Sequence, residues 1–224
     1  MARKRPTTPP PAAAAELRII GGRLRGRKIA YHGDQVTRPM KERVREAAFN
    51  LIGPSIKGKL AIDLFAGTGA LGLEALSRGA SAAVFIERHL PTIRVLRQNI
   101  AGLAVEDATT IAASDTYFWA RGLPDVLRTP DGGGSHPIKT AQNETPWVVF
   151  CSPPYALYQD RRDETLEMIS RVQATAPPES VVVVEADGAF DFALLPAAEA
   201  WDVRPYPPAV IGIWRKPDDA AAAD

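Results

Sequence analysis

The chain has little cysteine, little histidine and no long hydrophobic run. Its one cysteine, Cys151, cannot form a disulfide within the chain, and the three histidines His32, His89 and His136 are too scattered to indicate a metal site. No apolar run approaches the roughly 18 residues of a membrane span, and the N-terminus has no hydrophobic signal region. We therefore expect a cytoplasmic protein that uses neither a metal nor a membrane anchor.

What the sequence does have is the composition of an ordinary globular protein, with an uneven distribution of charge. Of its 224 residues, 46% are hydrophobic and 24% are charged, which is enough for one catalytic domain with a sizeable core. The net charge of +1 conceals a first fifty residues with twelve Lys/Arg against four Asp/Glu, which leaves the remainder at −7. A basic segment on an acidic body indicates a phosphate-binding surface, or equally a solvated basic face.

Composition divides the chain into segments. Residues 1–16 are basic and rich in proline and alanine, which predicts a disordered tail, and residues 17–36 contain two short apolar stretches among glycines and arginines, which predicts a basic hairpin. Residues 37–218 form the predicted catalytic domain, followed by a flexible tail at 219–224. The polar, glycine-rich stretch 121–145 predicts a surface insertion within that domain.

The catalytic domain alternates between helix and strand patterns. An amphipathic helix is predicted after Pro39, with an apolar face of Met40, Val44, Ala47, Ala48 and Leu51 and polar faces of Lys41, Glu42, Arg43, Arg45 and Glu46. The predicted strands are KLAIDLF, SAAVFIE, ATTIAA, WVVFC, VVVVE and two more at 201–204 and 210–215; helices are predicted at 70–79, 91–101, 116–120 and 163–173. This order predicts a Rossmann-like α/β fold, with a mainly parallel seven-stranded sheet and helices on both faces.

Polar side chains fall at or just beyond the ends of four predicted strands, at Asp63, Glu87, Asp115 and Ser152. One polar residue after an apolar run commonly marks only the end of a strand. Four at one edge of a parallel sheet are more specific, because the carboxyl ends of the strands are where such folds bind ligands. The sequence therefore predicts a binding site along this edge.

A glycine-rich turn joins the first of these strands to its helix. Gly67, Gly69 and Gly72 have the spacing of a dinucleotide-binding turn, which suits a nicotinamide dinucleotide or S-adenosylmethionine. Asp63, just before them, favours the second ligand. A carboxylate there repels a pyrophosphate, whereas it attracts the cationic ammonium end of S-adenosylmethionine.

Two further carboxylates fit such a ligand. Glu87 can accept hydrogen bonds from the ribose hydroxyls of either cofactor. Asp115 can accept a hydrogen bond from an adenine amino group, or it can simply cap the helix that follows it.

The tetrapeptide Ser152-Pro153-Pro154-Tyr155 indicates chemistry on the amino group of a base. Such an amino group is a poor nucleophile because its lone pair is delocalised into the ring. If Ser152 Oγ and the Pro153 carbonyl each accept one of its protons, the nitrogen becomes tetrahedral and its lone pair can face a methyl donor. The prolines keep the backbone rigid, and Tyr155 can stack on a flipped-out base. A tight Pro-Pro turn without function is the alternative.

Taken together, the motifs resemble one family. LRIIGGRLRGRKI, TRPMKERVREAAFN, DLFAGTGALGLEALSRGA and SPPY are similar to segments of the bacterial small-subunit (16S) ribosomal RNA guanine-N2 methyltransferases, over about residues 17–215. The resemblance implies a class I methyltransferase domain that uses S-adenosylmethionine. It also implies that the cofactor is held by Asp63, Phe65, Gly67, Gly69, Glu87 and Asp115, and that guanine N2 is positioned by Ser152, Pro153, Pro154 and Tyr155. The RNA-binding residues that it implies are Arg23, Arg25, Arg27 and Lys28 of the basic hairpin, together with Arg38 and Arg43, which would help form the RNA pocket or the cofactor pocket.

The chain departs from the family pattern at two places. Ser152 stands where the family usually has aspartate, and the stretch 121–145 is longer than usual. A serine carries no charge and does not readily take up the proton lost after methyl transfer, so water or another carboxylate must receive it. We therefore expect slower chemistry than with aspartate.

Three alternatives stay open. The same tetrapeptide serves adenine-N6 methyltransferases of DNA or RNA, and loss of the aspartate is compatible with an RNA-binding or ribosome-assembly protein that has kept the fold without catalysis. A nicotinamide-dependent dehydrogenase would leave Ser152 to Tyr155 unexplained. The partner expected from the resemblance is ribosomal RNA, alone or within an assembling small ribosomal subunit, and the chain is expected to be a monomer.

Overall fold

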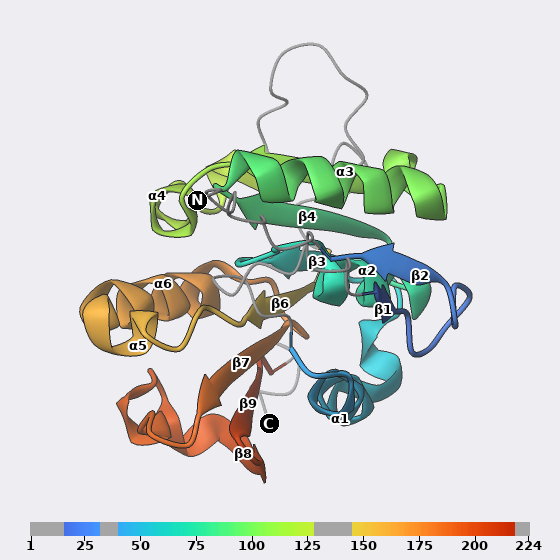
Figure 1. Cartoon of the computed structure of the whole chain (residues 1–224). Coiled ribbons are helices and arrows are strands. Elements are labelled where there is room, and N and C mark those ends of the chain that lie inside the picture. Colours follow the sequence, from blue (N-terminus) through green and yellow to red (C-terminus); the bar gives the residue numbers. More distant parts are fainter. Residues whose placement is uncertain (1–15, 32–39, 128–144, 218–224) are drawn as a thin grey trace, which may run out of the picture.

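The computed structural model of the chain describes residues 16–31, 40–127 and 145–217 (Figure 1). Their strands are β1 (Glu16–Arg18), β2 (Lys28–Ala30), β3 (Leu60–Asp63), β4 (Ala82–Glu87), β5 (Thr109–Ala113), β6 (Trp147–Cys151), β7 (Val181–Asp187), β8 (Trp201–Tyr206) and β9 (Ala209–Arg215). Their α-helices are α1 (Glu42–Ile52), α2 (Ala70–Ser77), α3 (Leu90–Leu103), α4 (Thr116–Arg121), α5 (Leu157–Asp160) and α6 (Arg162–Thr175). Within these ranges, every helix is too short or too polar to cross a membrane.

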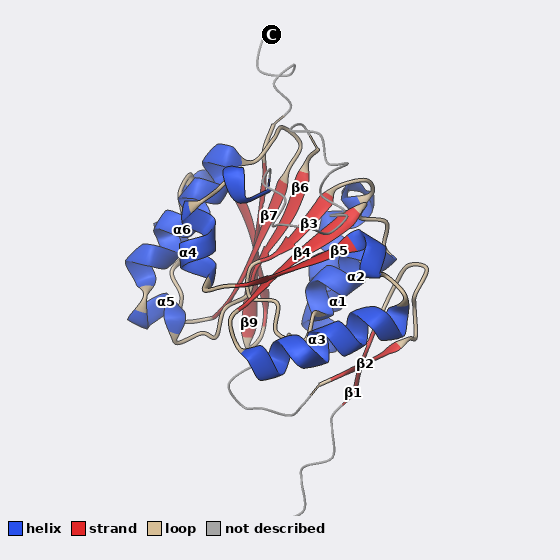
Figure 2. Cartoon of the chain, turned by 90° about the horizontal axis from the view of Figure 1, so that it is seen from above, coloured by secondary structure: helices blue, strands red, loops and turns tan. Residues whose placement is uncertain are grey.

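The main sheet has seven strands in the order β5-β4-β3-β6-β7-β9-β8. The first five are parallel, and β9 runs antiparallel to both β7 and β8. Figure 2 shows this sheet between α1, α2 and α3 on one side and α4, α5 and α6 on the other. The predicted Rossmann-like architecture is therefore confirmed, including its mainly parallel sheet.

The central strands are apolar throughout because helices cover both of their faces. On β6, Val148 and Phe150 pack into the core beneath α1, α2 and α3, while Val149 and Cys151 pack into the core beneath α4 and α6. Successive side chains of a strand point to opposite faces, so a strand buried on both sides has no polar alternation. Cys151 is thus a buried core residue.

Gly72, in the first turn of α2, has no room for a side chain. A Cβ atom there would lie 2.3 Å from the ring of Phe85, which is fully buried on β4. Gly72→Ala is therefore expected to lower the free energy of unfolding by about 1–3 kcal/mol, because the packed core must shift. Urea denaturation measures the change. The matched control is Gly102→Ala on α3, where no atom lies within 4 Å of the new Cβ and helix propensity favours alanine; an equal loss there would contradict the packing explanation.

The antiparallel pair β1–β2 lies against α2 and α3. The amides of Ile20 and Gly21 donate to the Glu74 carboxylate over 2.7 and 2.8 Å, and the amide of Leu24 donates to Ser77 Oγ over 2.9 Å. Glu74 and Ser77 are buried residues of α2. Two side chains of α2 thus fix the segment that connects β1 to β2.

The prediction that Arg45 lies on a polar face of its helix is wrong. Arg45 is only 1% exposed, its Nη2 donates to the Arg18 carbonyl over 2.6 Å, and its Nε lies 4.0 Å from Glu74 Oε2. Burial lowers the pKa of Arg45, and the Glu74 carboxylate opposes that shift. The partners come from β1 and α2, so the helical period of α1 alone could not reveal them.

Several predicted boundaries differ from those observed. The helix expected directly after Pro39 begins at Glu42. Glu16, which was predicted to belong to the N-terminal tail, is the first residue of β1. Part of the predicted insertion at 121–145 is regular, because Arg121 ends α4 and Asp125–Leu127 form a 3-10 helix. Residues 1–15, 32–39, 128–144 and 218–224 lie outside the described residues, so the predictions for both tails, for most of the insertion and for Arg38 lie outside them too.

Candidate active site

The polar strand ends come together along one edge of the sheet. Asp63 is the last residue of β3 and Glu87 the last of β4, while Asp115 lies just beyond β5 and Ser152 just beyond β6. These four strands are parallel neighbours in the order β5-β4-β3-β6. We call this the carboxyl edge of the sheet. It is where parallel α/β sheets bind their ligands.

Two of the carboxylates hold the glycine turn that connects β3 to α2. Asp63 Oδ2 accepts a hydrogen bond from the Gly72 amide over 3.1 Å, and Glu87 Oε2 accepts one from the Gly67 amide over 3.0 Å. Glu87 Oε1 also accepts the His89 amide over 2.8 Å. The turn is therefore clamped between two strands.

Asp63 is fully enclosed, whereas Glu87 is half-buried at the surface of the edge. Burial raises the pKa of Asp63 to about 7, and the nearby Glu87 carboxylate adds to the shift, while the hydrogen bonds from the backbone oppose it. A nearby cation would favour the ionised form of this carboxyl group.

The turn leaves space for a ligand above Gly67. Gly67 and Gly69 both have positive φ angles, 52° and 93°, which favour glycine. A Cβ at Gly69 would lie 2.5 Å from Leu96, but one at Gly67 would meet no atom within 4 Å. Gly69 is thus glycine because of packing, while the open face at Gly67, next to the Glu87 carboxylate, fits the ribose end of a nucleoside cofactor. Phe65 is half-buried in the same turn and packs edge-on against Tyr117, with 6.0 Å between the centres of the two rings.

Asp115 is the N-cap of α4. Its Oδ1 accepts hydrogen bonds from the amides of Tyr117 and Phe118 over 3.0 and 3.3 Å, and Oδ2 lies 3.3 Å from both Arg88 and Arg161. Partial burial alone would raise the pKa of Asp115, but these amides and Arg161 lower it. The capping interpretation is therefore observed, and it does not preclude a further hydrogen bond to a ligand.

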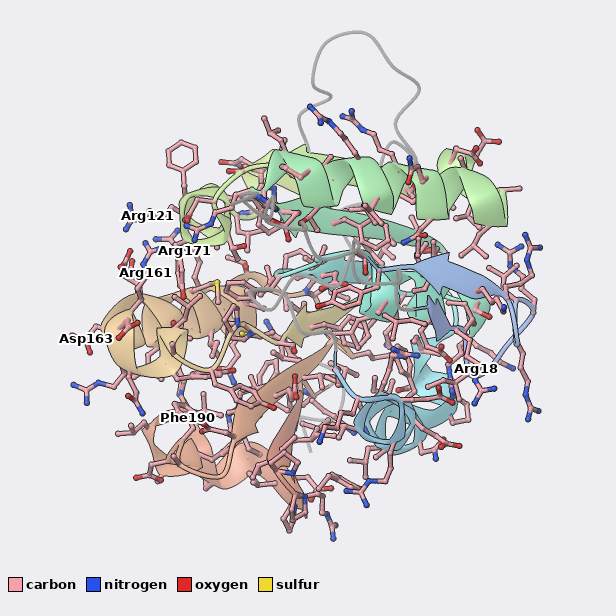
Figure 3. The ribbon with its side chains drawn as sticks, in the orientation of Figure 1. Arg18, Arg121, Arg161, Asp163, Arg171 and Phe190 are labelled. Carbon is pink, nitrogen blue, oxygen red and sulfur yellow. The ribbon has the colours of Figure 1, made fainter. Side chains whose placement is uncertain are left out.

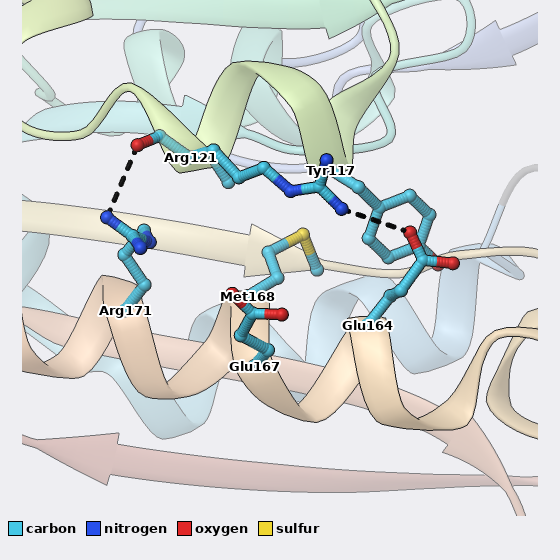
Figure 4. A pocket seen from close by; sticks show the side chains of 7 residues that line it. Tyr117, Arg121, Glu164, Glu167, Met168 and Arg171 are labelled. Carbon is cyan, nitrogen blue, oxygen red and sulfur yellow. Dashed lines mark hydrogen bonds and ion pairs between the residues drawn. The ribbon is translucent and has the colours of Figure 1, made fainter.

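Arg161 links Asp115 to the helices behind it. Its guanidinium lies 3.9 Å from the centre of the Tyr117 ring and 2.6 Å from Glu164. Figure 3 shows Arg161 with Arg121 and Arg171 on one side of the molecule and Arg18 on the other. A small cleft between α4 and α6 lies beside it (Figure 4), lined by Tyr117, Ala120, Arg121, Glu164, Glu167, Met168 and Arg171.

Contacts across this cleft hold α4 on α6. Arg121 lies 3.5 Å from Glu164, and Arg171 donates to the Arg121 carbonyl over 3.2 Å. The cleft is thus part of the helix packing that positions Asp115 at the carboxyl edge.

Ser152 to Tyr155 form a bend directly after β6. Pro153 is buried, whereas Ser152 and Tyr155 are half-buried. The Leu157 amide donates to the Pro154 carbonyl over 2.9 Å, which closes the bend into α5. Among the described residues, the Pro153 carbonyl accepts no backbone hydrogen bond, so its acceptor capacity is not used by the main chain.

Sequence reasoning missed Glu185, the residue that the bend contacts. It is 5% exposed on β7, where its Oε2 accepts a hydrogen bond from Ser152 Oγ and its Oε1 one from Tyr155 Oη over 2.8 Å. Burial raises the pKa of Glu185, while these two hydrogen bonds lower it. The apolar run VVVVE that ends in a carboxylate was the available signal, because the same pattern marks Asp63 and Glu87.

The predicted RNA-binding residues are not all on the carboxyl edge. All of Arg23, Arg25, Arg27 and Lys28 are exposed; the Arg23 amide donates to the Ser77 carbonyl at the far end of α2, and Arg27 donates to the Gly102 carbonyl near the end of α3. The eight residues of α2 place Ser77, the contact of Arg23, about 12 Å from the glycine turn. Arg43, by contrast, donates to the Pro207 carbonyl over 2.9 Å, in the β8–β9 turn at the carboxyl edge. In the described ranges, no group of three or more His, Cys, Asp or Glu has the arrangement of a metal site.

Comparison with known proteins identifies the family. The family model described as Conserved hypothetical protein 95 matches residues 17–124. Ribosomal RNA small subunit methyltransferase D of Escherichia coli K12 is 40% identical over 114 residues, which cover 50% of this chain and 58% of that relative. The protein of the same name from Haemophilus influenzae is 34% identical over 148 residues, 65% of this chain and 67% of that relative. The chain belongs to the ribosomal RNA small subunit methyltransferase D family.

The fold of this methyltransferase D family member agrees with that assignment. The solved structure of the Escherichia coli protein yhhF, described as a methyltransferase, is 28% identical and covers 91% of this chain and 99% of its own, with a TM-score of 0.65. The sequence resemblance to ribosomal RNA methyltransferases is thereby confirmed at the level of family and fold. The aligned part spans little more than half of the Escherichia coli methyltransferase D relative.

Proposed function

We propose that this chain transfers a methyl group from S-adenosylmethionine to the N2 amino group of a guanine in small-subunit ribosomal RNA. One observation carries the proposal: the bend Ser152–Tyr155 and the glycine turn follow adjacent parallel strands, β6 and β3, and so lie side by side at the carboxyl edge. Family membership supports the substrate class, since the relatives are named for small-subunit ribosomal RNA.

The residues at the glycine turn fit the cofactor. When bound, S-adenosylmethionine supplies an electrophilic methyl group on a cationic sulfur. Glu87 would accept hydrogen bonds from the ribose hydroxyls. Asp115 has a lowered pKa and is therefore ionised, and it would accept a hydrogen bond from the adenine amino group. Asp63 would favour the ammonium end through its charge beneath the turn, with Phe65, Gly67 and Gly69 forming the contact surface of the turn.

The bend would prepare the amino group. Ser152 Oγ donates its own proton to Glu185, which leaves its lone pairs for an amino proton, and the Pro153 carbonyl would accept the other. Drawing both protons away from the ring plane localises the nitrogen lone pair, and the rigid Pro-Pro backbone fixes its direction. Tyr155 would stack on the base and hold it out of its helix.

Incubation with undermodified small ribosomal subunits and tritiated S-adenosylmethionine tests the proposal, followed by nucleoside mass spectrometry. We expect radiolabel in 16S ribosomal RNA and 2-methylguanosine as the product. N6-methyladenosine would instead support the adenine-methylating alternative. No incorporation into either subunits or naked RNA, with the RNA still bound, would support the alternative of a binding protein without catalysis.

The exposed cations near the far end of α2 would bind phosphates that flank the target nucleotide. Replacing Arg23 and Arg25 together with alanine is expected to reduce the slope of log Kd against log salt by about 1.5, because each lost phosphate contact contributes about 0.7–0.9. Fluorescence anisotropy with a 16S fragment at several KCl concentrations gives the slope. Arg204→Ala, which removes an exposed arginine from β8, is the control; an equal reduction there would show a general charge effect.

A further inference from the structure

Glu185 is a buried acidic residue whose side chain is hydrogen-bonded to the bend that the proposed reaction uses. It lies on β7, whose Val184 pairs with Cys151 of β6, so that Glu185 and Ser152 occupy neighbouring positions of adjacent parallel strands. Both of its carboxylate oxygens face the bend, one toward Ser152 Oγ and the other toward Tyr155 Oη. The Tyr158 hydroxyl donates to its main-chain carbonyl over 2.8 Å, which fixes the backbone.

This placement supplies what serine lacks. A serine hydroxyl holds a proton of its own, so it can take one from an amino group only if its own proton has somewhere to go. In this structure that hydroxyl already points at a carboxylate. Ser152 is half-buried and the Glu185 side chain that its hydroxyl contacts is nearly enclosed, so Ser152 is the more accessible of the two, which is the order that a proton path requires.

We infer that Glu185 is the final proton acceptor of the methyl transfer and that Ser152 relays the proton to it. The inference rests on the proposed function. As the bond from nitrogen to carbon forms, the bond from carbon to sulfur breaks, and the positive charge moves from sulfur to the amino nitrogen. One amino proton then passes to Ser152 Oγ while the hydroxyl proton of Ser152 passes to Glu185 Oε2. A neutral methylamino group, a neutral thioether and a neutral glutamic acid remain.

Four other titratable groups surround this path. Tyr155 and Tyr158 donate to Glu185 and keep pKa values raised above the ordinary range by burial. Cys151 is buried and burial raises the pKa of its thiol to about 12, so it stays a neutral thiol. Asp187, two residues along β7, acts on Tyr155 through its charge. Glu185 is thus the carboxylate that is hydrogen-bonded to the Ser152 hydroxyl and can take its proton.

The test is a swap of the carboxylate between two positions, measured as single-turnover methyl transfer. Glu185→Gln keeps the shape of the side chain and one acceptor oxygen but not its basicity, and is expected to slow transfer about 100-fold, within the range for general bases. Ser152→Asp places a carboxylate at the bend itself and is expected to raise the rate of the otherwise unchanged chain. When Ser152→Asp is present, adding Glu185→Gln is expected to lower the rate of methyl transfer by less than about 5-fold. A purely structural role for Glu185 would give equal losses in both backgrounds.

Two further measurements keep the outcome decisive. Calorimetric affinity for S-adenosylhomocysteine and the melting temperature should stay close to those of the unaltered chain in each variant. Should Glu185→Gln fail to fold, Ser152→Ala interrupts the same path with Glu185 in place, and retention of more than a tenth of the rate would overturn the relay. If the unaltered chain transfers methyl groups and Glu185→Gln keeps over a third of its rate, only this inference is overturned. No transfer by the unaltered chain would overturn the proposed function itself.

Discussion

Replacing Asp63 with asparagine is expected to weaken the binding of S-adenosylmethionine about 50-fold at pH 8 and to remove its dependence on pH. In the unaltered chain, burial holds the pKa of Asp63 at about 7, so the carboxyl group is largely neutral at pH 6. The ammonium end of the ligand favours the ionised form. Affinity should therefore rise with pH through 7 and then level off, and titration calorimetry at several pH values gives the curve.

Ionisation of Asp63 has the opposite effect on folding: it strengthens cofactor binding but lowers the stability of the fold. The pKa of Asp63 in the folded chain lies above its ordinary value of 3.8, so this group stabilises the fold fully below that value and progressively less as the pH rises to about 7. Bound cofactor should thus raise the melting temperature more at pH 8 than at pH 6. 5′-Methylthioadenosine, which lacks the amino acid end, is the matched control ligand. Equal pH dependence with that ligand, or in Asp63→Asn, would refute a role for the charge.

Tyr155→Ala is expected to lower kcat/KM for ribosomal RNA at least about 100-fold while leaving the affinity for the cofactor within twofold. Stacking of a base on an aromatic ring contributes about 1–3 kcal/mol, and misplacing the amino group adds a further loss in the rate of transfer. Tyr155 stands at the end of the bend, half-buried, with its hydroxyl held by Glu185. Steady-state kinetics with a 16S fragment, together with calorimetry, separate the two quantities.

Tyr155→Phe keeps the ring and loses only the hydrogen bond to Glu185, so it should retain more than about a tenth of the activity. Equal losses in Tyr155→Phe and Tyr155→Ala would show that the hydroxyl, and not the ring, is what the reaction needs. A loss of cofactor affinity in Tyr155→Ala would show that the ring contacts the cofactor, which contradicts the proposed stacking on the base.

The carboxyl edge was predictable because its determinants are local. Strands buried on both faces must be nearly all apolar, so a carboxylate that ends such a run, as Asp63 and Glu87 do, marks the strand end directly in the sequence. The glycine turn was equally visible. Once the strands are placed in a parallel sheet, their ends share one edge whatever the helices do.

The parts that could not be predicted depend on contacts between distant segments. Arg45 follows the polar pattern of α1, but Glu74 of α2 and the backbone of β1 bring it into the core. Glu185 ends an apolar run like the others, yet its partnership with Ser152 requires that β6 and β7 be neighbours in a particular register. The distance of Arg23 and Arg25 from the carboxyl edge likewise follows from the docking of their segment on α2.

A crystal structure of the chain with S-adenosylhomocysteine is the most direct measurement of the central claim, which is the relative position of the methyl donor and the bend. We predict that the sulfur lies beside the glycine turn and faces Ser152 Oγ and the Pro153 carbonyl, with space between them for a methyl group and one amino nitrogen. A sulfur directed away from the bend, or packed side chains filling that space, would contradict the account.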